Sequence, residues 1–219
     1  MAPRVTVPAV TQISRLMVTS VSLQKAKPTL LQRLARKVGF LDLSRSRLKG
    51  AGYIIYEQCV DNMNFMQFIE EVKMPDTLFS WFLVTELHCW LLMTRAMAEG
   101  AEGRAVRNSI TEALWQDVST RIKKLEAPNV GQTMQELSQQ FQAAIIGYDE
   151  GLQSGDIVLA GALWRRMLSK DPNIKPETLE FLVNYVRRQA ENLDSIPRDQ
   201  ILSKPEIKWL PLKPPAVNK

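Results

Sequence analysis

The chain has 219 residues, 45% of them hydrophobic, which is an ordinary size and composition for one globular domain. Sustained polar–apolar alternation and Asn-Gly or Asp-Gly hairpins are missing, so we predict an all-α fold: one helical bundle with a basic N-terminal arm and an extended, proline-rich C-terminal tail. The net charge is +5, yet residues 1–50 carry ten Lys or Arg and a single acid, which argues against a uniformly basic nucleic-acid binder and indicates targeting or an anionic contact surface.

Residues 1–25 are typical of a mitochondrial presequence. They contain two arginines, no acid and many hydroxyl side chains, and Ile13, Leu16 and Met17 lie close together on a helical wheel. No apolar core or small-residue cleavage site suggests secretion. The alternative is a basic tail without a targeting role.

Residues 26–46 form the predicted basic arm. Within it, residues 29–38 predict a short amphipathic helix that ends at Gly39. Such a helix can lie on anionic lipid, on ribosomal RNA or on a partner, or it can dock on the domain with its basic side in solvent. The basic residues proposed for binding, in the arm and at the start of the helix that follows it, are Arg33, Arg36, Lys37, Arg45, Arg47 and Lys49.

Residues 47–203 are predicted to be the helical domain. Its first helices cover residues 47–63 and 64–72, and Asp76 is the expected N-cap of a third helix over residues 78–97. This third helix is apolar almost all round, but Glu86 and His88 near its middle argue against a membrane span. We predict that it is the buried central helix of the bundle, with a membrane-embedded helix as the alternative.

Four more helices are expected along the chain. Gly100 and Gly103 precede a helix over residues 106–125, which Pro128 ends. Another apolar helical run stops at Gly147, is followed by an acidic turn over residues 148–151, and resumes in a new helix after Asp156. A last helical stripe runs from residue 179 to residue 193, and residues 204–219 form the tail.

No catalytic, cofactor or metal site is predicted. His88 is the chain's single histidine, and Glu86 lies two residues away on a different face of the same helix, so the two do not form a catalytic pair. We expect His88 to be a core histidine bonded to a backbone carbonyl or a buried side chain. Cys59 and Cys89 are expected to be buried free thiols. The carboxylates around residues 149–156 do not match the spacing of an EF-hand loop.

Several ordered strings in the chain resemble the ubiquinol–cytochrome c chaperone family. The resemblance covers roughly residues 65–212. Its motifs are Trp81-Phe82, Leu87-His88-Cys89-Trp90, AAIIGYDE over residues 143–150, ALWR over residues 162–165, Val183-x-Tyr185-Val186-Arg187 and Trp209-Leu210-Pro211-Leu212.

The resemblance implies a non-enzymatic assembly chaperone for respiratory complex III, held peripherally on the matrix side of the mitochondrial inner membrane. Such a chaperone binds newly made cytochrome b together with a small helical partner subunit, close to the mitochondrial ribosome, and has no role with DNA. The short N-terminal part of this chain leaves little room for a ribosome contact. The candidate residues for binding partner or client are Tyr148, Asp149, Glu150, Gly151, Trp164, Arg165 and Trp115, the last as an exposed aromatic.

Two other functions fit parts of the sequence. A mitochondrial RNA-binding translation factor would use the basic arm as its main surface. A lipid- or quinone-binding helical protein would hold the apolar helix around residues 81–93 against a cavity. Neither function accounts for the acidic segment over residues 147–151.

Overall fold

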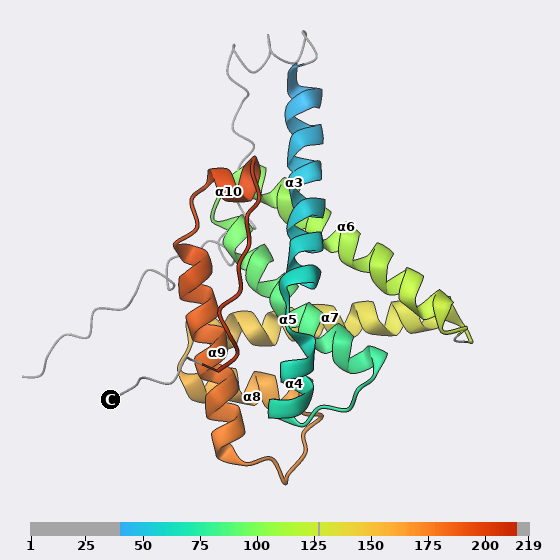
Figure 1. The fold of residues 1–219 in the computed structure, drawn as a ribbon, viewed down its shortest axis with the longest axis vertical. Coiled ribbons are helices and arrows are strands. Elements are labelled where there is room, and N and C mark those ends of the chain that lie inside the picture. The colour runs from blue at the N-terminus through green and yellow to red at the C-terminus, as the bar shows by residue number, and fades with distance from the viewer. Residues whose placement is uncertain (1–39, 127, 214–219) are drawn as a thin grey trace, which may run out of the picture.

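The computed structural model describes residues 40–126 and 128–213, with side chains from residue 45 onward. These residues form helices and no strand, so the all-α prediction is confirmed (Figure 1). The predicted presequence, the predicted helix over residues 29–38, and Arg33, Arg36 and Lys37 lie outside the described residues. The helices are α3 (Phe40–Asn62), α4 (Phe65–Val72), α5 (Leu78–Met97), α6 (Gly100–Lys124), α7 (Val130–Gln153), α8 (Asp156–Arg166), α9 (Pro176–Asp194) and α10 (Asp199–Leu202).

Helix α5 is the centre of the bundle. Every residue from Ser80 to Ala96 is buried, as a helix that is apolar on all sides requires in water. Helices α3, α6 and α9 pack around it (Figure 1). None of the described helices has the length and hydropathy that crossing a membrane would take. The N-cap is Thr77 instead of the predicted Asp76, because the Thr77 hydroxyl accepts a hydrogen bond from the Ser80 amide at 3.2 Å.

Helix α3 begins at Phe40, earlier than the predicted start at residue 47, so Arg45, Arg47 and Lys49 are exposed residues of a helix that packs on α6. The two helices approach closely because residue 52 is glycine: a Cβ atom there would lie 2.5 Å from the Ser109 Cβ. Lys49 then reaches across to α6 and pairs with Glu112 at 3.0 Å.

The predicted acidic turn over residues 148–151 is wrong, because helix α7 continues through it to Gln153. The chain breaks instead at Ser154 and Gly155, and α8 begins at Asp156. Gly151 looked like a turn residue, but its role is close packing: a Cβ atom on it would lie 2.7 Å from the Leu159 Cα on α8. Gly100 and Gly103 were likewise expected to precede a helix, whereas α6 already begins at Gly100.

After α10, residues 203–213 run without helix along α3 and α9; we call this segment the strap (Figure 1). Two glutamine side chains bind its backbone as a neighbouring β-strand would. The Gln189 side chain donates to the Leu210 carbonyl at 2.7 Å and accepts from the Leu210 amide at 3.2 Å. The Gln58 side chain donates to the Pro205 carbonyl at 2.9 Å and accepts from the Ile207 amide at 2.8 Å. These bonds tie the end of the domain to helices α3 and α9.

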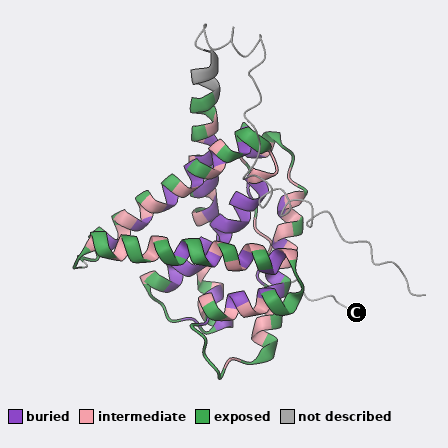
Figure 2. Cartoon of the chain, turned by 180° about the vertical axis from the view of Figure 1, so that it is seen from behind, coloured by how far each residue is buried: buried purple, intermediate pink, exposed green. Residues whose placement is uncertain are grey.

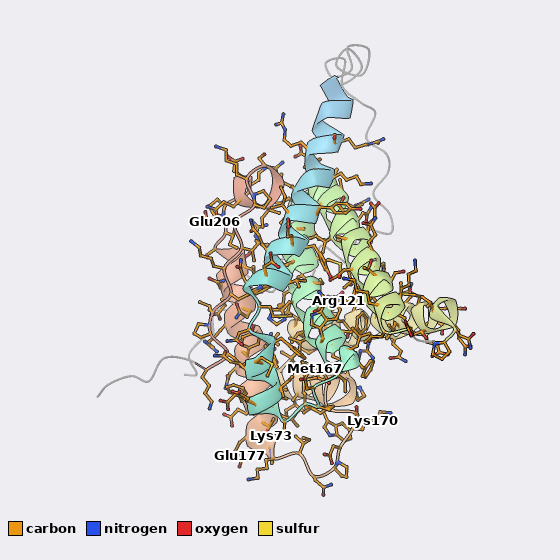
Figure 3. The ribbon with its side chains drawn as sticks, turned by 45° about the vertical axis from the view of Figure 1, so that its right-hand side comes forward. Lys73, Arg121, Met167, Lys170, Glu177 and Glu206 are labelled. Carbon is orange, nitrogen blue, oxygen red and sulfur yellow. The ribbon has the colours of Figure 1, made fainter. Side chains whose placement is uncertain are left out.

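Gln189→Ala tests how much the strap contributes to the fold. Gln189 is fully buried, so its loss leaves the amide and carbonyl of Leu210 without partners and should lower the free energy of unfolding by about 1–3 kcal/mol in urea titrations. Glu206→Ala is the control on the strap itself, since Glu206 projects outward (Figure 3) and pairs with exposed Lys208. Equal unfolding midpoints for the two variants would contradict this role of Gln189.

Candidate functional site

The residues selected from the sequence do not form one exposed surface. Tyr148 and Gly151 are buried against neighbouring helices, whereas Glu150 and Arg165 are exposed. Asp149, Trp164 and Trp115 are partly buried. The reason is the helical repeat: since α7 continues past residue 147, successive residues of the acidic segment point to different sides of the helix.

Asp149 joins α7 to the central helix. The fully buried Trp90 donates its indole N–H to Asp149 Oδ1 at 2.7 Å, and the ring of Tyr148 lies 5.1 Å from the Trp90 ring. Burial raises the pKa of the Asp149 carboxyl, and the bond from Trp90 opposes this shift. Asp149 therefore positions a core aromatic, which is a different role from the predicted contact with a partner.

A buried ion pair joins α5 to α8. Glu86 is fully buried, and Arg166 donates to it in a bidentate arrangement, Nε to Oε1 at 2.7 Å and Nη2 to Oε2 at 2.6 Å. Arg166 also donates to Gln140 on α7 at 2.8 Å, so that one guanidinium connects three helices. Burial raises the pKa of the Glu86 carboxyl even though Arg166 lowers it. The apolar pattern of α5 predicts a buried Glu86, but no local pattern indicates that Arg166 is its partner.

His88 is a core histidine, as predicted. Its Nδ1 lies 2.7 Å from the Val84 carbonyl, which can only accept, so Nδ1 carries the proton and Nε2 accepts from the Tyr185 hydroxyl at 2.7 Å. The Trp209 ring of the strap packs against the imidazole with centroids 4.5 Å apart. Burial lowers the pKa of His88 to about 4, so the ring is neutral at neutral pH.

Two further residues of the sequence strings stabilise loops. Trp164 donates its indole N–H to the Asp171 carbonyl at 2.8 Å and so holds the loop between α8 and α9, where Figure 3 labels Met167 and Lys170. Arg187 on α9 caps the end of α7 by donating to the carbonyls of Leu152 at 2.8 Å and Ser154 at 3.0 Å. Both side chains act within the fold.

Helices α5, α6 and α7 enclose a surface hollow of about 210 Å³, which we call the Trp115 groove. Trp115 was expected to be an exposed aromatic, but one side of it packs in the core, with ring centroids 5.9 Å from Phe82 and 5.4 Å from Phe141. No sequence pattern indicates the groove, because its residues come from three helices. The lining residues are Trp90, Met93, Arg107, Thr111, Trp115, Ser138, Phe141, Gln142 and Ile145.

Exposed apolar side chains lie near the groove and on α8. Ile146 on α7 is 68% exposed, and Ile157 at the start of α8 is 89% exposed. Figure 2 shows α7 lying across the back of the molecule with much of its outer side exposed. Within residues 40–126 and 128–213, no group of three or more His, Cys, Asp or Glu side chains is arranged to hold a metal ion. The exposed Ile146 and Ile157 offer apolar surface for binding another molecule.

Comparison with known proteins decides the family. A family model described as "Ubiquinol-cytochrome C chaperone" matches residues 70–209, which include α5 to α9 and most of the strap. The chain belongs to the ubiquinol-cytochrome C chaperone family. The residues matched by this model include the Glu86–Arg166 pair, His88 and the whole Trp115 groove.

Similar proteins include two curated relatives and one solved structure. Ubiquinol-cytochrome c reductase complex assembly factor 1 of Drosophila melanogaster is 49% identical over 86% of this chain and 75% of its own length. Its Xenopus laevis counterpart is 38% identical over 80% of this chain and 88% of its own length. The crystal structure of a Cbp3 homolog from Brucella abortus matches with a TM-score of 0.65 and 21% identity, over 84% of this chain and 98% of that one. At that identity the last match shows a shared fold alone.

Arg166→Ala tests the buried pair. It leaves a buried carboxylate without its counter-charge, so the free energy of unfolding should fall by about 3–5 kcal/mol at pH 7. Arg166 opposes the effect of burial on the pKa of Glu86, so its removal raises that pKa above its wild-type value in the folded state, and the folded variant takes up a proton at a higher pH than the wild type. The loss should therefore be smaller at pH 5 than at pH 8. Lys49→Ala removes a solvent-exposed pair and should change stability little. A loss independent of pH would contradict this account of Glu86.

His88 should give the protein a distinct sensitivity to acid. Its folded pKa of about 4 lies below the ordinary value of 6.5, so between these two pH values the unfolded state binds more protons than the folded state. The free energy of unfolding therefore falls as the pH falls from 6.5 to 4. Relative to His88→Gln, the wild-type chain should lose up to about 3 kcal/mol of unfolding free energy between pH 7 and pH 4. Denaturant titrations across this range measure the difference, and parallel pH profiles would show that His88 is not buried in its neutral form.

Proposed function

We propose that this chain is a mitochondrial assembly chaperone for respiratory complex III that acts by binding and not by catalysis. The observation that carries the proposal is the family match over residues 70–209, together with 49% identity to a protein named as an assembly factor of the ubiquinol–cytochrome c reductase complex. The buried state of His88 and Glu86 agrees with a binding role, because neither side chain is open to a substrate.

The proposed client is newly made cytochrome b, held together with a small helical partner subunit. An integral membrane client exposes apolar helices until it is assembled, so a protein that receives it needs apolar contact surface in water. The Trp115 groove and the exposed Ile146 and Ile157 supply such surface on a bundle whose helices are tied together by buried polar bonds. Of the residues first selected, Glu150 and Arg165 remain accessible for these contacts.

The proposed location is the matrix side of the inner membrane, with peripheral contact and proximity to the mitochondrial ribosome. Residues 1–25 supply the expected presequence, and the basic residues up to Lys49 supply positive charge for anionic lipid or ribosomal RNA. Arg45 and Arg47 are exposed on α3, so they are accessible to such a surface. No cofactor and no DNA contact are part of the proposal.

Isolation of a tagged chain from mildly solubilised mitochondria, after pulse-labelling of mitochondrial translation products, tests the proposal. Labelled cytochrome b and a small helical protein should be recovered together. Recovery of RNA alone, with salt-sensitive affinity, would favour a translation factor, and recovery of lipid or quinone alone would favour a carrier; either result would overturn the chaperone proposal.

Ile146→Glu should reduce the recovery of labelled cytochrome b or of the small protein several-fold, because a charge placed in an apolar contact must be desolvated. Gln139→Glu, at an exposed position on the same helix, adds the same charge and should leave recovery unchanged. If both variants behave like the wild type, the contact surface lies elsewhere on the molecule.

A further inference from the structure

Arg107 is the single charged residue that lines the Trp115 groove. It is partly buried, and within the described part of the chain its guanidinium donates to the side-chain oxygen of the adjacent Asn108, at 2.8 and 3.2 Å. No acidic side chain of the described residues pairs with it. A charged group at the edge of an apolar surface is strongly stabilised by a counter-charge, so the groove is suited to an occupant that brings one.

The acids nearby on α6 are not free to serve as that counter-charge. Glu112 pairs with Lys49 on α3 at 3.0 Å, and Asp117 pairs with Arg121 at 3.0 Å and accepts a bond from the Tyr56 hydroxyl at 2.8 Å. Arg104, one turn before Arg107, adds further positive charge. The α6 side of the groove is therefore positive, and burial together with Arg104 lowers the pKa of Arg107.

The shape of the groove favours a helix over a small molecule. Its volume of about 210 Å³ is below the roughly 300–1,000 Å³ typical of pockets that enclose small ligands. Its two sides come from α6 and α7, which diverge from their shared corner, and its floor comes from α5, which lies behind them when the molecule is seen from behind (Figure 2). The lining residues repeat once per turn on both sides: Arg107, Thr111 and Trp115 on α6, and Ser138, Phe141, Gln142 and Ile145 on α7. Two such rows present ridges between which the side chains of a third helix can pack.

We propose that the Trp115 groove binds an amphipathic helix of a partner protein, whose apolar side chains pack on Trp115 and Ile145 and whose acidic side chain pairs with Arg107. The inference rests on the proposed function, since it names the kind of protein segment that the chaperone holds at this site. Helix-in-groove binding uses anchors at positions i, i+3 or i+4, and i+7 of the bound helix. The acidic residue sets the orientation and register of that helix.

Designed peptides test the inference with the full chain. The probes are fluorescently labelled, stapled helices of one leucine-rich amphipathic sequence that differ at a single rim position, which carries Glu, Gln or Lys. The Glu peptide should bind at least about 10-fold more tightly than the Lys peptide, a difference of about 1.4 kcal/mol. Arg107→Glu should reverse this preference, whereas Lys123→Glu, the same change of charge at an exposed position near the end of the same helix and outside the groove lining, should keep it. Anisotropy titrations at 0.15 M salt measure the affinities.

The contrary results are equally specific. Equal affinity for the three peptides, or an unchanged preference in Arg107→Glu, would overturn the inference; if Arg107→Glu does not fold, Arg107→Gln replaces it and should abolish the preference. If labelled cytochrome b is recovered from mitochondria but the peptides bind without a charge preference, the chaperone function is supported and the groove is not its helix-binding site. A charge preference without recovery of cytochrome b would establish the helix site and reject the chaperone function.

Discussion

The fold depends on burying α5 on every side, although this helix carries charged and polar groups. Glu86, His88 and Arg95 are all buried on it, and each one needs a partner from a different part of the chain. Glu86 takes Arg166 from α8, and His88 takes Tyr185 from α9. The guanidinium of Arg95 donates to the carbonyl of Leu193 at 3.0 Å, at the end of α9. Apolar burial drives the helices together, and these polar groups restrict which side of α5 each neighbour can cover.

The same arrangement explains why the surface suited to binding lies where it does. Helices α3, α8, α9 and the strap are held to α5 or to one another by polar side chains that are already paired. Helices α6 and α7 diverge and leave between them a groove whose floor is the buried Trp90 and Met93 of α5. It lies beside Arg107, for which the described residues provide no acidic partner. A bundle with a groove at its surface and paired polar side chains elsewhere is suited to holding a polypeptide segment.

Which residues of the acidic segment over residues 147–151 are accessible depends on whether that segment forms a helix or a turn. The string from Gly147 to Gly151 contains two glycines and two acids, which favour a turn by local chemistry. In the folded chain Gly151 allows α8 to approach α7, and this packing outweighs its low helix propensity of about 1 kcal/mol. Tyr148 and Gly151 thereby become core residues, and the accessible residues are their neighbours Ile146 and Glu150.

The sequence by itself determined the all-α class, the bounds of the central helix, the buried histidine and the family, because apolar patterns and long ordered strings are local properties of the chain. Only the tertiary structure decided that α7 continues through the acidic segment, that Arg166 is the partner of Glu86, and that Arg107 lies beside Trp115 at a groove. Glu86 and Arg166 are 80 residues apart, and the groove joins side chains from three helices. Contacts of this kind depend on how the helices pack, and helical periodicity within one segment does not specify the packing partner of a given face.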